Sequence, residues 1–531
     1  MKKVISMLLV LVMALGIFSG CGKTNVEELP EGTVKLRVGI PQRATVTDYN
    51  DNKFTNYLEK EANVEIEFVF FSSSEKEYTQ QLALMCSAKE TLPDVILGFN
   101  LSHYIVNQYG EDGYFIDLTE YIEEYAPNYK NQLKQLDEET QKYVTEKGKN
   151  TNDGSYYGMP LVMCETTDNF QSLMHINRKW LDTLGLPIPT TVEELRSTLQ
   201  AFKTQDPNGN GVADEIPMLG NIHITNYLIN GFVLYDMNNF NVTDGKVWDP
   251  IQTDEFRQAL IYANGLVKDK LFSELSFSIS SNAEYKNLIS PSDEDSKVGV
   301  FVGHPETMTN AATDALDEFT ALPALSDATG KGGYSMITPA GVNWRGFITK
   351  DCQYPAAAMK LLDVFYTDET VTRQRHGEKD VDWVYEEGKT PYGTDSYAQA
   401  INSEAFFSGN STWCFNALGM MTHWNYLLIA TEGEGRIAQA SRIQKEQWEL
   451  YENARTPKEE AVNLVYTTEE YEIREEKAST VSSFIYTEVN KFVSGQTDPS
   501  SDSDWNTFLS TLKSIGREEL MKVCQDAYDR Q

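Results

Sequence analysis

Residues 33–71 read TVKLRVGIPQRATVTDYNDNKFTNYLEKEANVEIEFVFF, and this stretch decides the fold class. Its two ends, TVKLRVGI at 33–40 and NVEIEFVFF at 63–71, are rich in bulky and β-branched residues and predict strands. Between them, apolar residues recur at helical spacing in NKFTNYLEKEA at 52–62. The stretch therefore predicts a β–α–β unit.

The next segments extend this unit into a sheet. KEYTQQLALMCSAKE at 76–90 predicts a helix, and LPDVILGF at 92–99 predicts a third strand. Apolar residues at consecutive positions in that strand are typical of a parallel sheet buried on both faces. Ligands of such sheets bind beyond the carboxyl ends of the strands, so the loops after Ile40 and Phe99 are predicted to line a ligand site.

Strand and helix patterns alternate again in the second half of the chain. A helix is predicted at 253–271, a strand at 297–303 and a helix at 355–367, after which the sequence is mostly helical. Thr190 and Glu193, three residues apart, predict a capping box at the start of another helix. The alternation predicts an α/β fold, and 531 residues are too many for one hydrophobic core.

The N-terminus has the layout of an export signal. Residues 1–20 carry two lysines, an apolar run shorter than a membrane span, and a small Ser-Gly pair before Cys21. Cys21 in this position resembles the lipidated cysteine of bacterial lipoproteins, although Phe18 stands where Leu is usual. An ordinary cleaved signal with a chance cysteine is the alternative. Residues 21–32 then form a polar tether.

The charge of the chain excludes several classes of partner. Its formal net charge is −34, which repels nucleic acid and anionic lipid headgroups and mildly disfavours a strongly anionic ligand. The six cysteines include no CxxC pair, so neither a zinc ribbon nor a dense disulfide framework is indicated. Together with the export signal, these features predict a protein that acts outside the cell and binds neither nucleic acid nor an anionic membrane surface.

The segment DPNGNGVADEIP at 206–217 concentrates oxygen side chains around two glycines. Its oxygen donors match positions 1, 3, 5, 7 and 9 of a calcium loop, the seventh being a backbone carbonyl: Asp206, Asn208, Asn210, Val212 and Asp214. The twelfth position, which should hold a bidentate Glu, is Pro217, and Glu215 is the nearest substitute. Asp, Asn and Gly also favour solvated turns, so a turn without metal remains an alternative.

Several segments, taken together and in this order, resemble the family 1 extracellular solute-binding lipoproteins of bacterial ABC importers, in particular the large members with a calcium loop that bind oligosaccharides. These segments are TDYNDNKFTNYLEKEANVEIEF (47–68), LPDVIL (92–97), YGEDGYFIDLTEYIEEYAPN (109–128), YYGMPLV (156–162), NRKWLDTLGLPIPTTVEEL (177–195) with the calcium-like loop, and EELMKVCQDAYDR (518–530). The resemblance implies a structural calcium held by Asp206, Asn208, Asn210, the Val212 carbonyl, Asp214 and Glu215.

The resemblance also implies the domain organisation and the function. We expect a two-lobe α/β fold of the periplasmic-binding-protein type, with crossing hinge segments and a mostly helical C-terminal region. The first lobe is expected at 33–165 and 322–365, and the second at 166–321 and 366–531. The expected protein is a monomer, lipid-anchored at Cys21 on the outer face of the cell membrane, that delivers an oligosaccharide to an ABC permease.

Sugars are held by aromatic rings and by hydrogen-bonding side chains, so loop residues of these types are the candidate ligand contacts. The candidates are Gln42, Asp48, Tyr49, Asn100, Tyr104, Trp344, Arg345, Trp383, Trp413 and Trp424.

The sequence offers no familiar catalytic motif: GxSxG, HExxH, Walker and GxGxxG patterns are absent. A glycoside hydrolase needs only two suitably placed carboxylates, so a surface hydrolase stays an alternative, distinguished by the release of shortened sugars. A peptide-binding lipoprotein and an adhesin or scaffold without a small ligand are further alternatives.

Overall fold

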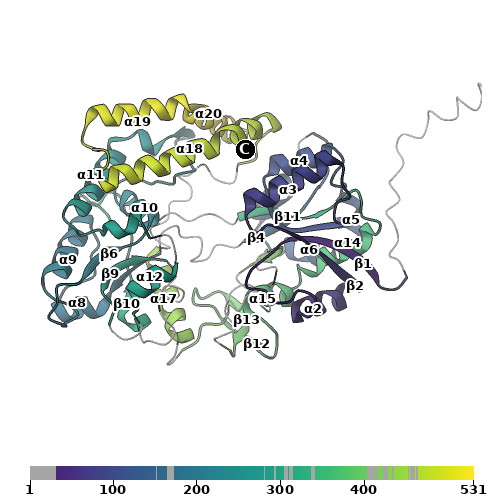
Figure 1. Cartoon of the computed structure of the whole chain (residues 1–531), viewed down its shortest axis with the longest axis horizontal. Helices are drawn as coiled ribbons and strands as arrows, with labels where there is room; N and C mark the ends of the chain where they lie inside the picture. Colours follow the sequence, from purple (N-terminus) through teal and green to yellow (C-terminus); the bar gives the residue numbers. More distant parts are fainter. Residues whose placement is uncertain are drawn as a thin grey trace, which may run out of the picture.

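The computed structural model of the chain consists of two α/β lobes that lie side by side (Figure 1). The structure describes residues 31–150, 152–163, 173–279, 282–291, 295–303, 309, 315–335, 341–402, 413, 417–422, 428–432, 436–451, 454, 461 and 464–530. Within these ranges, no helix is long and apolar enough to cross a membrane.

The first lobe is built on a six-stranded mixed sheet in the order β14-β4-β11-β3-β1-β2. Its strands are β1 (Val34–Pro41), β2 (Val64–Phe71), β3 (Val95–Leu101), β4 (Met159–Met163), β11 (Gly341–Ile348) and β14 (Gly419–Met421). Its helices are α2 (Lys53–Ala62), α3 (Glu75–Ala88), α4 (His103–Glu111), α5 (Thr119–Tyr125), α6 (Pro127–Leu133), α7 (Glu138–Gly148), α14 (Pro355–Val364) and α15 (Asp368–His376). A hairpin of β12 (Trp383–Lys389) and β13 (Asp395–Ala400) adjoins α15.

The second lobe is built on a four-stranded sheet in the order β10-β5-β9-β6. Its strands are β5 (Met174–Asn177), β6 (Ile216–Leu219), β9 (Val298–Val302) and β10 (Phe319–Ala321), with a separate ribbon of β7 (Asn241–Thr243) and β8 (Lys246–Trp248). Its helices are α8 (Arg178–Leu184), α9 (Val192–Thr204), α10 (Ile222–Asn230), α11 (Asp254–Lys268), α12 (Asn282–Ile289), α17 (Arg436–Tyr451), α18 (Thr468–Ser494), α19 (Asp502–Ser514) and α20 (Arg517–Tyr528). The predicted helical C-terminal region is confirmed.

The β–α–β start is confirmed strand by strand. β1 pairs in parallel with β2 on one side and with β3 on the other. Asn52 caps α2 by accepting a hydrogen bond from the backbone N–H of Phe54, and Asn63 ends the helix in the left-handed conformation (φ 56°). Because the chain leaves β1 towards β2 and then returns to its other side with β3, the carboxyl ends of β1 and β3 flank a crevice of the kind in which ligands bind.

The chain returns from the second lobe to the first through β11. This strand lies between β3 and β4 and is antiparallel to both. Trp344 is opposite Leu101 of β3 and Pro160 of β4, and an irregularity in the register follows between Trp344 and Gly346. Bulges of this kind change the direction in which neighbouring side chains point and are common beside functional sites.

Both later lobe boundaries differ from the sequence-based expectation. Residues 322–335, expected in the first lobe, stay with the second, where Leu322 and Leu325 lie in its core and the Leu322 N–H donates to the Met174 carbonyl. β14, expected in the second lobe, belongs to the first, since it pairs in parallel with β4. These pairings join residues distant in sequence, so local patterns do not reveal them.

The predicted capping box is one residue away from its observed position. The side chain of Thr191, and not of Thr190, accepts the N–H of Glu194 at 3.1 Å, and the Glu194 carboxylate accepts the N–H of Thr191 at 3.3 Å. The N–H and the hydroxyl of Thr190 also donate to the Glu194 carboxylate, so this carboxylate accepts hydrogen bonds from both adjacent threonines. The helix therefore starts at Val192.

A buried ion pair fixes the C-terminal helices to the second lobe. At the start of α20, the Arg517 guanidinium donates two 2.9 Å hydrogen bonds to the two carboxylate oxygens of Asp249. The side chains are 3% and 0% exposed, and the guanidinium also lies 4.0 Å from the ring centroid of Phe240. A buried pair of this kind is costly to break on one side only, because the remaining charge is left unpaired.

Replacement of Arg517 by Met is expected to lower the free energy of unfolding of the second lobe by about 3–5 kcal/mol, because Asp249 keeps a buried charge without a partner. The exposed pair of Lys513 and Glu518, 3.0 Å apart, is the control, and Lys513→Met should cost less than about 1 kcal/mol. Chemical denaturation of both variants measures the difference. Equal losses would contradict the assigned role of the buried pair.

Candidate functional site

A cavity of about 270 Å³ lies where α4 of the first lobe meets α18 of the second. The two helices approach each other in Figure 1, and α18, 27 residues long, reaches from the second lobe towards α4. The side chains that dominate its walls are Asn100, His103, Lys147 and Trp344 of the first lobe and Tyr466, Tyr471 and Arg474 of the second. Both lobes therefore build this cavity.

The first-lobe wall follows from the ends of two strands and the start of a helix. β3 ends at Leu101, and Ser102 then caps α4 by accepting the N–H of Ile105, so His103 is the first residue of the helix. Trp344 comes from β11, beside Leu101. The wall thus occupies the carboxyl end of β3, as the rule for parallel sheets predicts.

The second-lobe wall is the start of α18. Thr467 and Glu470 form a capping box there, which fixes the first turn and with it Tyr471. The Tyr471 ring lies 4.9 Å from that of His103 and 5.5 Å from that of Tyr466, measured between centroids. The aromatic contact between His103 and Tyr471 therefore joins the two lobes.

Two polar groups at the cavity are buried without a hydrogen-bond partner in the described residues. They are the Trp344 indole Nε1 and the His103 imidazole, of which both nitrogens lack a partner. Trp344 is 2% exposed and His103 is 6% exposed. Burial lowers the pKa of His103 to about 4, so the ring is neutral at physiological pH. Unpaired buried polar groups are costly, and a ligand with hydrogen-bonding atoms would remove that cost.

The structure brings only part of the predicted ligand set to this cavity. Asn100 and Trp344 line it, and Tyr104 packs against the core of the second lobe from α4. Arg345 and Trp413 line a separate cavity of about 40 Å³ at the carboxyl end of β1. Burial lowers the pKa of Arg345, which stays cationic.

Gln42, Asp48 and Tyr49 lie apart from the main cavity. Asp48 closes a turn by accepting the N–H groups of Asn50 and Asp51, and Gln42 is exposed. The Tyr49 hydroxyl accepts the N–H of Arg43 at 2.7 Å, so it anchors the loop after β1. The side chains of Asp48 and Tyr49 therefore shape that loop.

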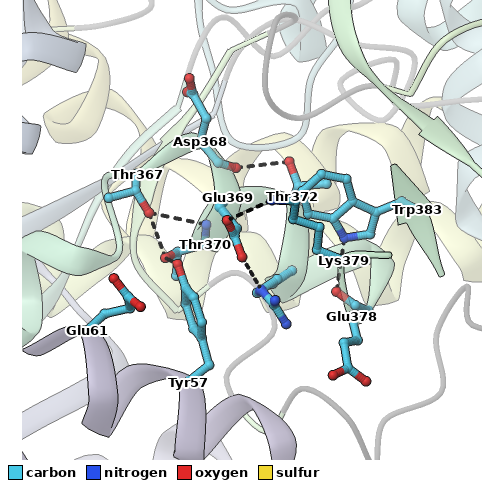
Figure 2. Close-up of polar contacts among 12 residues, drawn as sticks. Tyr57, Glu61, Thr367, Asp368, Glu369, Thr370, Thr372, Glu378, Lys379 and Trp383 are labelled. Carbon is cyan, nitrogen blue, oxygen red and sulfur yellow. Dashed lines mark hydrogen bonds and ion pairs between the residues drawn. The ribbon is translucent and has the colours of Figure 1, made fainter. Parts of the chain in front are cut away.

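Two of the predicted tryptophans are core residues. Trp383 is fully buried beside α15, and its Nε1 donates to the Gly377 carbonyl at 3.1 Å (Figure 2). Trp413 is 2% exposed, and its Nε1 donates to the Thr55 hydroxyl at 2.7 Å. Both were predicted as loop residues that contact the ligand, whereas both indoles have satisfied interior partners. Trp424 lies outside the described residues.

Sequence reasoning missed most of the polar half of the site: His103, Lys147, Tyr466, Tyr471 and Arg474. One signal was available, because YTTEEYEIR at 466–474 contains the T-x-x-E capping box and so places two tyrosines at a helix start. Lys147 gave no comparable signal, since packing of α7 against β11 decides its place.

The calcium-like loop connects α9 to β6, away from the cavity. Much of it forms an ordinary turn: Asn208 Oδ1 accepts the N–H of Asn210, and Asn210 Oδ1 accepts the N–H of Val212. Asp214 pairs with Lys297 at 3.0 Å. The side chain of Val212 points to solvent, and its carbonyl accepts the N–H of Asp214.

Two carboxylate oxygens of this loop are not explained by a turn. Asp206 Oδ1 and Glu215 Oε1 are buried and have no hydrogen-bond partner in the described residues. Burial, together with the charges of Asp206 and Asp214, raises the pKa of Glu215. No group of three or more His, Cys, Asp and Glu in the described ranges is arranged to hold a metal ion, so calcium here would also need the Asn and carbonyl oxygens. A cation fits the unpaired oxygens.

Known proteins that this chain resembles are described as solute-binding or substrate-binding proteins. A family model described as bacterial extracellular solute-binding protein matches residues 43–372. The fructooligosaccharide ABC transporter substrate-binding protein FusA of Streptococcus pneumoniae is 26% identical over 345 residues, which cover 60% of this chain and 61% of FusA. The chain thus spans about three fifths of the length of this curated relative.

Two solved structures share the fold over nearly the whole chain. An EF-hand mutant of S. pneumoniae FusA, in complex with fructo-nystose, has a TM-score of 0.76 at 19% identity and covers 93% of this chain and 99% of its own. An HMO-binding, ABC-transporter-associated solute-binding protein from Bifidobacterium longum infantis has a TM-score of 0.73 at 21% identity and covers 94% and 99%. Both likenesses support the two-lobe architecture.

Replacement of His103 by Phe is expected to reduce the acid sensitivity of the first lobe. The folded-state pKa of about 4 is below the ordinary 6.5, so the stability that this group contributes is complete above pH 6.5 and is lost as pH falls towards 4. At pH 5 the loss amounts to about 2 kcal/mol. Chemical denaturation at pH 7.5 and at pH 5 measures the loss of unfolding free energy between the two pH values. This loss should be smaller in the variant than in the unsubstituted protein by about 2 kcal/mol. Equal drops would refute the buried neutral imidazole.

Proposed function

Because this chain belongs to the bacterial extracellular solute-binding protein family, we propose that it is the substrate-binding component of an ABC importer and captures an oligosaccharide between its two lobes. The observation that carries the proposal is a cavity with aromatic walls from both lobes, Trp344 on one side and Tyr466 and Tyr471 on the other. Aromatic faces pack against the apolar faces of sugar rings. The relatives are described as binding fructooligosaccharide, fructo-nystose and HMO.

The mechanism is lobe closure. A ligand that contacts both walls of the cavity stabilises the conformation in which the lobes approach, by its differential affinity for that state. The closed protein then presents its surface to the permease. Trp344, His103 and Asn100 hold the first-lobe side of the sugar, and Tyr471 and Arg474 hold the second.

The sugar is held without being changed. The cavity offers donors and rings, and the carboxyl group that lines it, Glu75, is exposed and accepts a hydrogen bond from Asn100 at 3.3 Å. Hydrolysis of a glycosidic bond requires two carboxyl groups placed across it. Binding without turnover is therefore the function that this lining supports.

Lipidation at Cys21 would keep the protein on the outer face of the cell membrane, close to the permease. Anchoring raises the effective concentration of the loaded protein without a new contact. Cys21 and residues 22–30 of the tether lie outside the described residues.

A structural calcium ion in the loop 206–215 completes the proposal. Asp206, Asn208, Asn210, the Val212 carbonyl, Asp214 and Glu215 would hold it, and the two unpaired carboxylate oxygens support the assignment. The ion would offset two of the three negative charges of Asp206, Asp214 and Glu215 and fix α9 relative to β6. It lies away from the sugar and takes no part in binding it.

Binding is tested with residues 22–531, in calcium, against a panel of soluble oligosaccharides. A ligand at about 100 times its dissociation constant should add roughly 2.7 kcal/mol to the stability, and chromatography should recover the sugar intact. Trp344→Phe, which removes the indole Nε1 and part of the ring, should weaken binding about tenfold, the cost of one lost hydrogen bond and contact area. The buried Trp383→Phe is the control and should bind normally. Shortened sugar, or equal affinity in both variants, would overturn the proposal.

Calcium is tested by melting with and without chelator. Free calcium at 100 times its dissociation constant adds about 2.7 kcal/mol to the free energy of unfolding, and the chelator should remove this stabilisation. Asp206→Ala should abolish this sensitivity. Asp244→Ala is the matched control, since both residues have left-handed backbones (φ 46° and 50°), and it should keep the sensitivity. Identical melting of the unsubstituted protein in both conditions would refute a structural calcium.

A further inference from the structure

Two cationic side chains line the interlobe cavity without a carboxylate partner in the described residues. The Lys147 Nζ donates to the Tyr143 hydroxyl at 2.7 Å. Arg474 donates to the Tyr466 hydroxyl at 3.2 Å, and its guanidinium lies 4.3 Å from the centroid of that ring. Tyrosine hydroxyls leave both positive charges uncompensated.

This arrangement is unusual for such an acidic chain. Acidic residues outnumber Lys and Arg by 79 to 45, so carboxylates are not scarce. On the same two helices, Lys142 pairs with Glu146 at 3.8 Å and Lys477 pairs with Glu519 at 3.1 Å. Glu75, the carboxyl group at the cavity wall, instead accepts a hydrogen bond from Asn100 at 3.3 Å, so in the described residues it is Lys147 and Arg474 in particular that lack a carboxylate partner.

Two further polar groups of the cavity, the Trp344 indole and the His103 imidazole, offer donors. Trp344 Nε1 can only donate, and neutral His103 offers one N–H. α4, nine residues long, begins at His103, so its positive end faces the same region. Two buried unpartnered side chains and two cations that bond only to tyrosine hydroxyls in the described residues together favour a ligand that is rich in acceptors and negative in charge.

We propose that this cavity binds the carboxylate of a uronic acid unit, so that the preferred ligands are acidic oligosaccharides. The inference rests on the proposed function and specifies its substrate class. At about 270 Å³ the cavity is at the small end of ligand pockets, which suits one charged unit of a longer sugar. Lys147 and Arg474 pair with the carboxylate, and the tyrosine rings pack against the sugar face.

The net charge of −34 does not oppose this binding. Exposed charges are screened beyond about 8–10 Å at physiological ionic strength, whereas groups in direct contact inside a partly buried cavity are screened much less. The local cations therefore dominate over the acidic surface. The sequence-based expectation that the charge mildly disfavours anionic ligands applies to the surface and not to this cavity.

The test compares trigalacturonate with its fully methyl-esterified form, two ligands that differ in charge at the carboxyl groups. Calorimetry on residues 22–531 in calcium should show roughly 10- to 100-fold tighter binding of the acid, the range for charge-assisted hydrogen bonds. The affinity for the acid should fall as sodium chloride is raised. Tetra-alanine, a peptide with a free carboxylate and no sugar ring, is the third ligand tested and should not bind.

The variant Lys147→Met keeps the apolar stem and removes the charge. It should lose most of the preference for the acid while it binds the ester within about threefold of the unsubstituted protein. Lys142→Met, on the exposed face of the same helix, is the matched control and should keep the preference. Melting curves of both variants check that they are folded, and Arg474→Lys, which keeps the charge, provides a second variant that should retain the preference.

The outcomes separate this inference from the proposed function. Tight binding of neutral oligosaccharides with no preference for the acid would overturn the inference and leave the proposed function standing. A preference for the acid that Lys147→Met does not change would also overturn the assigned subsite. Binding of tetra-alanine alone would overturn both.

Discussion

The insertion of β11 between β3 and β4 is the interaction on which the arrangement of the two lobes depends. Its hydrogen bonds to both neighbours join β3 to β4 within the first sheet. In the sequence, β11 follows the strands of the second lobe. The chain must therefore cross between the lobes at least twice before it reaches α14. The same pairing places Trp344 beside Leu101, at the carboxyl end of β3, so the strand that joins the lobes also supplies the central ring of the cavity.

Each lobe has its own large hydrophobic core, and among the described residues the lobes meet beside the cavity through side chains of α4 and α18. Tyr104 and His103 of α4 contact the second lobe, where His103 meets Tyr471. Interfaces of this limited kind permit relative motion of the bodies they join. A sugar placed between these rings would add contacts to both bodies, which is the physical basis for closure. The polar groups that lack partners at this boundary then find them in the ligand.

Local patterns predicted the elements well and their long-range pairing poorly. The β–α–β start followed from alternation and helical spacing within 33–71, which local backbone preferences and burial decide. The lobe boundaries at 322 and 366 were misplaced, because β14 and the segment 322–335 are held by partners more than a hundred residues away. Single-sequence patterns carry little information on such pairings.

The difference between local patterns and long-range packing also explains which residues of the candidate site were predicted. Asn100 was predicted because ligands bind beyond strand ends, a rule that local structure reveals, whereas Trp344 was predicted as an aromatic residue of a loop and lies within β11. Trp383 was predicted as an aromatic loop residue, but packing around α15 buries its indole fully. Lys147 and Arg474 come from helices that only tertiary packing brings together. The chemistry of the cavity is thus a property of the assembled lobes.

A crystal structure of residues 22–531 with a bound oligosaccharide tests the central claim most directly. The account predicts an intact sugar between the lobes, in contact with Trp344 of the first lobe and with Tyr466 or Tyr471 of the second. A sugar that contacts only one lobe, or a cleaved sugar in this cavity, would contradict it.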